Sequence, residues 1–182
     1  MAGYPADLEH PATLTDGRAV SIRPIRPTDA VELRSAIAAA EPETLHARFL
    51  GAAPHDARSI QHLVEVDYVH RMALVAIDSA NVGVGVARYE GGSDGDTADA
   101  AVVVDQGWRR VGLGSLLLRD LSQAALRRGI TRFTALVLAE NRPVLALLRA
   151  SGLPFSGTTA GGTSEFVIRL DMLAAPPPVR RS

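Results

Sequence analysis

The 182-residue sequence contains no cysteine, and it contains no lysine because all 19 residues counted as lysine or arginine are arginine. The absence of cysteine excludes disulfides, thiolate metal sites and a cysteine nucleophile. No segment approaches the roughly 18 consecutive apolar residues that a membrane-spanning helix needs. The N-terminus also lacks the basic and apolar regions of a signal peptide. We therefore expect a cytoplasmic protein without a membrane partner.

Net charge and aromatic content are also low. The 19 arginines nearly balance 20 acidic residues, and the formal net charge of −1 gives no sign of a nucleic-acid-binding surface. Hydrophobic residues make up 47% of the chain and aromatic residues 4%, so we expect one folded domain with a core of Ala, Val and Leu. The five histidines show no ligand spacing around a carboxylate cluster, so we expect no metal site.

The spacing of apolar residues predicts a mixed fold. We expect strands at 18–25, 72–78, 82–90, 98–105, 132–138 and 163–170, and helices at 27–40, 42–51, 56–66, 112–128 and 143–151. The strongest helix has Leu113, Leu117 and Leu121 at four-residue spacing, and Gly129 ends it. This order indicates an α/β (α+β) domain, in which a mixed, mostly antiparallel central sheet of six or seven strands has helices on both faces. We expect the domain to span residues 16–173, between a flexible lead-in (1–15) and a disordered tail (174–182).

The stretch WRRVGLGS (Trp108–Ser115) lies between an expected strand and the strongest helix. It is not a dinucleotide fingerprint, because Leu117 stands where G-x-G-x-x-G requires its third glycine. It is not a P-loop either, since that motif requires a lysine. Gly112 and Gly114 allow the backbone to approach an anion, and a helix N-terminus offers unpaired amides to a phosphate. The spacing therefore predicts either a phosphate-bearing ligand or a tight strand–helix turn without a ligand.

Two longer segments resemble a known family. The segment AVVVDQGWRRVGLGSLLLRDLSQAALRRGI (101–130) resembles the acetyl-CoA-binding segment of GNAT-type N-acetyltransferases, whose [Arg/Gln]-x-x-Gly-x-[Gly/Ala] signature is met by Arg109–Gly114. The segment LAENRPVLALLRASGL (138–153) resembles the second cofactor segment of that family. RPIRPTDAVELRSAIAAAEPETLHARFL and LVEVDYVHRMALVAID are similar to the N-terminal half of bacterial protein lysine acetyltransferase domains. The resemblance extends over nearly the whole chain.

The resemblance implies a cofactor site for acetyl-CoA. Backbone amides of one loop would hold the cofactor diphosphate: Arg109, Arg110, Val111, Gly112, Leu113, Gly114 and Ser115. The side chains of Arg109 and Arg110 could add positive charge there. The Val103–Val104 backbone would pair with the pantetheine arm where two strands separate, and an amide there can polarise the thioester carbonyl. Asn141 would bond the same arm.

The resemblance also implies a catalytic carboxylate. An amine attacks only when neutral, so a carboxylate usually takes its proton. The lysine acetyltransferases have a glutamate near the start of the corresponding strand, and the matching residue is Asp99. Aspartate is one methylene shorter and needs a bridging water or a closer substrate; alternatively, Asp99 is an exposed carboxylate at a strand start. Glu90 and Glu140 are reserve candidates. Leu148 stands where many relatives have a tyrosine acid, so the thiolate leaves unassisted, through water, or with the help of another group.

These observations predict an acetyl-CoA-dependent N-acetyltransferase that acts on a primary amine through a carboxylate base, with protein lysine as the leading acceptor class. Two alternatives stay open. The acceptor is a small amine such as a polyamine, an amino acid or an aminoglycoside, or the domain binds acetyl-CoA as a catalytically weak sensor. The expected partners are acetyl-CoA and the amine acceptor, and the chain is expected to be a monomer or a homodimer.

Overall fold

A computed structural model describes residues 3–49, 53–92 and 95–172 of the chain. In these ranges eight strands form one sheet, in the order β1-β2-β3-β4-β5-β6-β8-β7. The strands are β1 (His10–Thr13), β2 (Ala19–Pro24), β3 (Arg71–Ile77), β4 (Gly83–Gly91), β5 (Thr97–Val104), β6 (Arg132–Leu138), β7 (Phe155–Ala160) and β8 (Thr163–Arg169). The α-helices are α1 (Ala30–Ala39), α2 (Pro42–Phe49), α3 (Ala57–Val64), α4 (Leu113–Leu126) and α5 (Arg142–Ser151). The same ranges contain three short 3-10 helices: η1 (Ala6–Leu8) before β1, η2 (Pro27–Asp29) before α1 and η3 (Gln106–Trp108) after β5.

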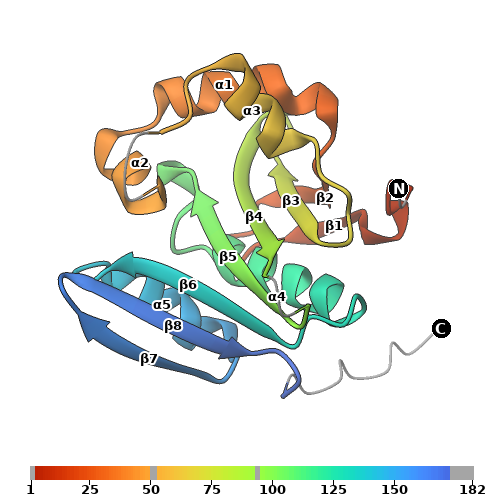
Figure 1. The fold of residues 1–182 in the computed structure, drawn as a ribbon. Coiled ribbons are helices and arrows are strands. Elements are labelled where there is room, and N and C mark those ends of the chain that lie inside the picture. Colours follow the sequence, from red (N-terminus) through yellow and green to blue (C-terminus); the bar gives the residue numbers. More distant parts are fainter. Residues whose placement is uncertain (1–2, 50–52, 93–94, 173–182) are drawn as a thin grey trace.

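The predicted fold class is confirmed. The sheet is antiparallel throughout except where β5 pairs with β6, and this single parallel pair makes it mixed. Helices α4 and α5 lie behind the sheet, and α1, α2 and α3 gather at the top of Figure 1. The predicted count of six or seven strands was wrong, because β1 and β7 were both missed.

The predicted flexible lead-in at residues 1–15 was also wrong in its second half. Residues 10–13 form β1, which pairs with β2 in the register His10–Ile22 to Thr13–Ala19. Pro11 is tolerated because β1 is the edge strand of the sheet, where a missing amide donor costs no ladder bond. Leu8 and Leu14 flank the strand and are buried at 7% and 6% exposure, so apolar contacts hold this segment against the core.

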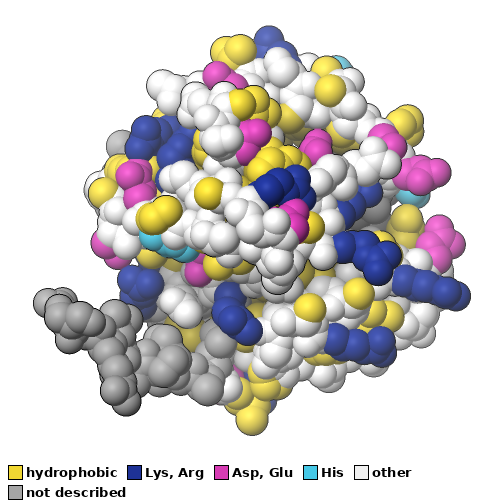
Figure 2. Space-filling model, turned by 180° about the vertical axis from the view of Figure 1, so that it is seen from behind, with side chains coloured by type: hydrophobic (Ala, Val, Ile, Leu, Met, Phe, Trp, Pro, Cys, Tyr) yellow, Lys and Arg dark blue, Asp and Glu magenta, His cyan; other side chains and the backbone are white. Residues whose placement is uncertain are grey.

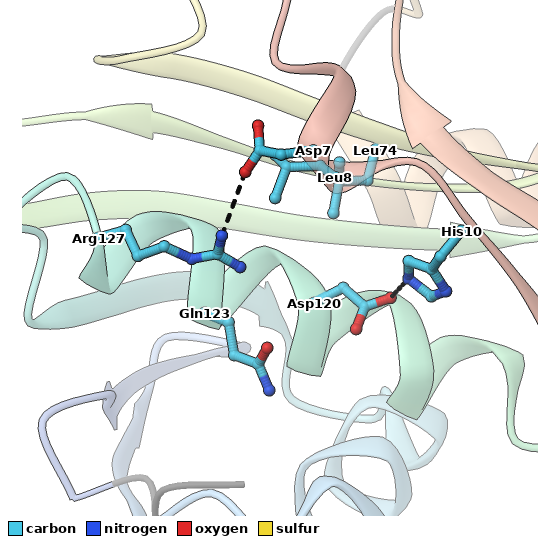
Figure 3. A pocket seen from close by; sticks show the side chains of 7 residues that line it. All are labelled: Asp7, Leu8, His10, Leu74, Asp120, Gln123 and Arg127. Carbon is cyan, nitrogen blue, oxygen red and sulfur yellow. Dashed lines mark hydrogen bonds and ion pairs between the residues drawn. The ribbon is translucent and has the colours of Figure 1, made fainter. Parts of the chain in front are cut away.

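A hydrogen bond and an ion pair also join the N-terminal segment to α4, across the small hollow in Figure 3. His10 Nε2 lies 2.9 Å from Asp120 Oδ2, and Arg127 Nη1 lies 3.3 Å from Asp7 Oδ2. Burial raises the pKa of the Asp120 carboxyl, and the neighbouring His10 acts in the opposite direction. These contacts link residues more than 100 positions apart, which the sequence pattern of the segment could not show.

Strand β7 (FSGTTA) was not predicted, because its small polar residues do not alternate with apolar ones. It is held as a hairpin on β8, from Phe155–Ile168 to Ala160–Thr163. Gly161 and Gly162 form the two-residue connection, with φ angles of +57° and +82°. Such turns need positive φ at both central positions and match the twist of the strands.

The core lies mainly between the sheet and α4. All three leucines of the predicted four-residue repeat, Leu113, Leu117 and Leu121, have no exposed surface, in line with the predicted apolar face. Glycines in the left-handed conformation follow the ends of α4 and α5: Gly129 at φ +85° and Gly152 at +72°. On the other face a smaller cluster of Ile25, Val64 and Ala73 is covered by α1 and α3. The predicted tail at 174–182 lies outside the described residues.

Candidate active site

The loop between β5 and α4 reverses the chain within a few residues. It begins with η3, which Asp105 caps by accepting a hydrogen bond from the Gly107 amide at 3.0 Å. The backbone then takes left-handed conformations at Arg110, with φ +63°, and at Gly112, with φ +89°. Gly112 is the N-cap of α4, and glycine adopts this conformation without a steric penalty. The left-handed backbone at Gly112 thus explains why the first glycine of the predicted motif is a glycine.

The first turn of α4 presents backbone amides that precede the hydrogen-bond ladder of the helix. The Leu116 amide bonds to the Gly112 carbonyl at 3.0 Å, so the amides of Leu113, Gly114 and Ser115 lie before the first bond. Among the described residues no side chain caps this helix end. Three such amides at the positive end of a helix dipole can bind an anion. They belong to the residues predicted to hold the diphosphate.

The side chain of Arg109 makes two contacts that the motif does not reveal. Its Nε donates to the Val104 carbonyl at 3.1 Å, and its Nη2 donates to Thr44 Oγ1 on α2 at 3.0 Å. Arg109 therefore links the end of β5 to α2. Arg110 is exposed at its left-handed position. The contribution of the two arginine side chains to diphosphate binding stays a prediction.

Strands β5 and β6 pair briefly and then separate. Their register contains three pairs: Thr97 with Arg132, Ala98 with Phe133, and Asp99 with Thr134. Beyond Asp99, β5 continues to Val104 with no paired strand on this side in the described chain. Helix α2 contacts both strands here. The sheet thus has an unpaired strand edge in its interior, beside the loop that precedes α4.

Pairing with β4 decides which backbone groups of β5 face this edge. The Asp105 amide bonds to the Val84 carbonyl at 2.9 Å, and ladder bonds alternate along an antiparallel strand. Val103, two residues before Asp105, therefore directs its amide and carbonyl toward β4. Val104 and Val102 direct theirs to the unpaired edge. Of the predicted pair, Val104 therefore presents its backbone groups to the unpaired edge, whereas Val103 does not because its groups face β4. Val102 presents its groups to the same edge, and pairing with pantetheine stays a prediction.

Asn141 lies in the turn between β6 and α5. Its side-chain oxygen accepts a hydrogen bond from the Val144 amide at 3.3 Å and caps α5. The amide NH2 group is the part of the side chain that this cap does not use. Helix α5 packs on α4 so closely that a Cβ at Gly114 would lie 3.1 Å from Leu147 Cδ1. The two predicted cofactor segments are therefore neighbours in the fold.

Asp99 lies at the last register pair before β5 and β6 separate. Its side chain is exposed, and its Oδ1 accepts a hydrogen bond from Thr134 Oγ1 at 2.6 Å. The residue directly opposite on β4 is Glu90, so the two carboxylates are cross-strand neighbours on one face. Glu90 is held by arginines, with Arg71 Nε at 3.7 Å and Arg88 Nη2 at 4.0 Å.

The other residues considered for the chemistry lie apart from this pair. Glu140 is exposed in the turn after β6, next to the cap of α5. Leu148 is 3% exposed in the core, where it packs as an apolar residue and offers no proton. Among the described residues no three His, Asp or Glu side chains gather as a metal site requires, and no helix is long and apolar enough to cross a membrane. On the rear face in Figure 2 basic and acidic side chains are interspersed over the upper part, and basic side chains predominate over the lower part.

Comparison with known proteins identifies a family. Residues 36–153 match the model of the acetyltransferase (GNAT) family. An acetyltransferase of Pseudomonas aeruginosa is 33% identical over 144 residues, which are 77% of each chain.

Two solved structures have a similar fold. The GNAT domain of S. lividans PAT superposes with a TM-score of 0.82 at 28% identity, over 92% of this chain and 99% of that one. The protein yncA of Salmonella typhimurium, solved with its cofactor acetyl-CoA, has a TM-score of 0.67 at 21% identity, over 87% and 98% of the chains.

Proposed function

The chain belongs to the GNAT family of acetyltransferases, and we propose that it transfers the acetyl group of acetyl-CoA to a lysine side chain of a protein acceptor. Acetyl-CoA supplies the acetyl group as an activated thioester. The observation that carries the proposal is the position of Asp99, an exposed carboxylate at the point where β5 leaves β6. From this point the unpaired edge of β5 continues to Val104, and the loop that follows ends at the first amides of α4.

The residues of the chain fit the cofactor. The amides of Leu113, Gly114 and Ser115 would hold the diphosphate at the start of α4. The outward backbone groups of Val104 would pair with the amide-containing pantetheine arm, as a neighbouring strand would. The NH2 group of Asn141 would contact the same arm. The left-handed N-cap supports this assignment, because it turns the loop so that the first amides of α4 point outward.

Asp99 would act as the general base. An acceptor ammonium must lose a proton before its nitrogen can attack, and a carboxylate at hydrogen-bond distance takes it. Glu90 is the neighbouring alternative, but its oxygens lie 3.7 Å from Arg71 Nε and 4.0 Å from Arg88 Nη2, so an acceptor ammonium that approaches it meets positive charge. Asp99 has a neutral partner, Thr134, on one oxygen. The comparison of the two carboxylates supports Asp99 as the proton acceptor.

An open surface beside Asp99 favours a polypeptide as the acceptor. In Figure 1 no helix covers the front of β6, β8 and β7, whereas α5 covers the back. Leu136 is 54% exposed there, and its register partner Glu165 is exposed as well. A small amine requires an enclosed site that surrounds it, whereas an extended chain can lie across an uncovered sheet. A lysine that approaches over this surface would reach the Asp99 end of β5.

The test is acetyl transfer from acetyl-CoA to a lysine peptide library, read by mass spectrometry, for the wild type and for Asp99→Asn. Removing a general base should lower kcat by about 100-fold or more, while the affinity for acetyl-CoA in calorimetry stays unchanged. Asp99→Glu should retain activity because it keeps the carboxylate. Glu32→Gln, which changes an exposed carboxylate on α1, is the matched control.

Three other outcomes would contradict parts of the proposal. Full activity of Asp99→Asn would exclude Asp99 as the base and direct attention to Glu90 and Glu140. Transfer to spermidine or free amino acids without transfer to any peptide would show a small-molecule enzyme. Acetyl-CoA binding without transfer to either class would show a sensor domain.

A further inference from the structure

Thr134 is the residue on β6 whose side chain reaches the proposed base. Its Oγ1 donates to Asp99 Oδ1 at 2.6 Å, and the two residues are also register partners. They form the last pair before the strands separate, so the hydrogen bond joins the side chains at the point where backbone pairing ends. A short hydrogen bond from a hydroxyl to a carboxylate belongs to the stronger class of such bonds.

Without this hydrogen bond, little else would fix the orientation of the Asp99 side chain. The side chain is exposed, and its neighbour across β4 is another carboxylate, Glu90, which repels it and is held by Arg71 and Arg88. An aspartate on an exposed strand can rotate about χ1 between staggered positions, and each rotation moves both oxygens. Thr134 itself is partly buried and β-branched, so its own χ1 is restricted. The stiffer residue thus fixes the more mobile one.

We propose that Thr134 is a positioning residue for the reaction: it holds Asp99 Oδ1 and so leaves Oδ2 in one orientation to accept the proton of the acceptor amine. This inference rests on the proposed function, because it requires Asp99 to be the base. The short side chain of aspartate makes the orientation critical. A displaced carboxylate oxygen cannot recover its reach by extending, as a glutamate could.

The experiment compares Thr134→Val, Thr134→Ser and the control Thr158→Val. Valine has nearly the shape of threonine but donates no hydrogen bond, and serine restores the donor. Thr158 lies on β7, on the same uncovered face and away from Asp99. We expect Thr134→Val to lower kcat by roughly 10- to 100-fold, since small misplacements of catalytic groups have effects of this size. The Kd and KM for acetyl-CoA should stay within about twofold, because this contact lies outside the amides that bind it.

Rescue and a double variant decide between positioning and a structural role. Thr134→Ser should recover kcat to within about threefold of the wild type, although it lacks the methyl group. In an Asp99→Asn background, Thr134→Val should cause no further loss, because the two residues act through one another. If valine lowers the melting temperature more than the control does, Thr134→Ala tested against Thr134→Ser replaces it.

The outcomes separate this inference from the proposed function. A Thr134→Val enzyme with wild-type kcat, beside an inactive Asp99→Asn enzyme, would overturn the positioning role and leave the base assignment intact. A serine variant as impaired as the valine variant would overturn it as well. Full activity of Asp99→Asn would instead overturn the base assignment on which both depend.

Discussion

Replacing Gly112 with alanine tests the link between the left-handed N-cap and cofactor binding. Gly112 has φ +89°, and a Cβ at this position would meet only Thr15 Cγ2, at 3.5 Å. The added methyl group would therefore fit without a steric clash. The cost comes from the backbone, because a residue with a Cβ loses roughly 1–2 kcal/mol in the left-handed conformation. For a chain of this length each kcal/mol corresponds to about 2–4 °C in melting temperature, so we expect a decrease of about 2–8 °C.

The same substitution should weaken acetyl-CoA binding. If the loop relieves its strain by leaving the left-handed region, the amides of Leu113, Gly114 and Ser115 turn away from their common direction. Loss of one hydrogen bond to a charged group corresponds to about 1.5–3 kcal/mol, which is roughly a 10- to 100-fold increase in Kd. Calorimetric titration with acetyl-CoA measures this increase, and thermal unfolding of the free protein measures the strain separately.

Gly114→Ala is the control for stability alone, because Gly114 has no positive φ but its amide belongs to the same proposed diphosphate site. Its added Cβ would approach Leu147 Cδ1 at 3.1 Å and Val104 Cγ2 at 3.6 Å, both ends of side chains that can move. Alanine in a helix also gains about 0.5–1 kcal/mol over glycine, so the free energy of unfolding should change little. A Gly112→Ala protein that melts and binds acetyl-CoA as the wild type does would refute the reasoning. A Gly112→Ala protein that is destabilised but binds acetyl-CoA with the wild-type affinity would indicate that the diphosphate binds at another site.

Three further predictions concern stability and mobility. Gly157→Ala should lower the free energy of unfolding by about 1–3 kcal/mol in urea denaturation, because the Cβ would lie 2.5 Å from the Phe166 ring. Burial raises the pKa of Asp29, but the hydrogen bonds from Arg23 and from the Arg26 amide, together with the charges of both arginines, hold it below 3.8. The pair therefore contributes stability that is full above pH 3.8 and lost as pH falls through the lower folded pKa, so Asp29→Asn should flatten the acid limb of a stability–pH curve. Thr44→Val, which removes one anchor of α2, should speed amide exchange in that helix without changing the melting temperature.

The strongly periodic elements could be predicted from the sequence because local physics decides them. The leucine repeat of α4 and the ending glycine were sufficient to place that helix within two residues, and β6 was placed without error. Strands β1 and β7 could not be found in this way. One contains a proline that is acceptable at a sheet edge, and the other contains Gly157 under an aromatic ring. Their structure depends on partners that lie elsewhere in the chain.

The residues of the candidate site also fall into those that a short segment reveals and those that depend on distant partners. Motif spacing identified the loop and its glycines, because these are properties of a short segment, and the family resemblance supplied Asp99 as the candidate base. Thr134 and Thr44 were missed, since a threonine in a strand or a helix gives no sign of its partner. The pairing of β5 with β6 brings Thr134 to Asp99, and only the register of a parallel pair decides this. The direction of the Val102 backbone groups toward the unpaired edge was missed for the same reason, because the pattern of ladder bonds depends on β4.

Arg109 shows why a charged residue in a motif needs its tertiary context. Its guanidinium has five N–H donors, and the Val104 carbonyl and Thr44 hydroxyl engage two of its nitrogens. Donors therefore remain for a phosphate while the arginine still links β5 to α2. The Val104 oxygen likewise has two lone pairs, so it can accept from Arg109 and from a pantetheine amide together. The contacts of Arg109 are thus compatible with the proposed cofactor site. Through Thr44 they also connect α2 to the first residue of the motif.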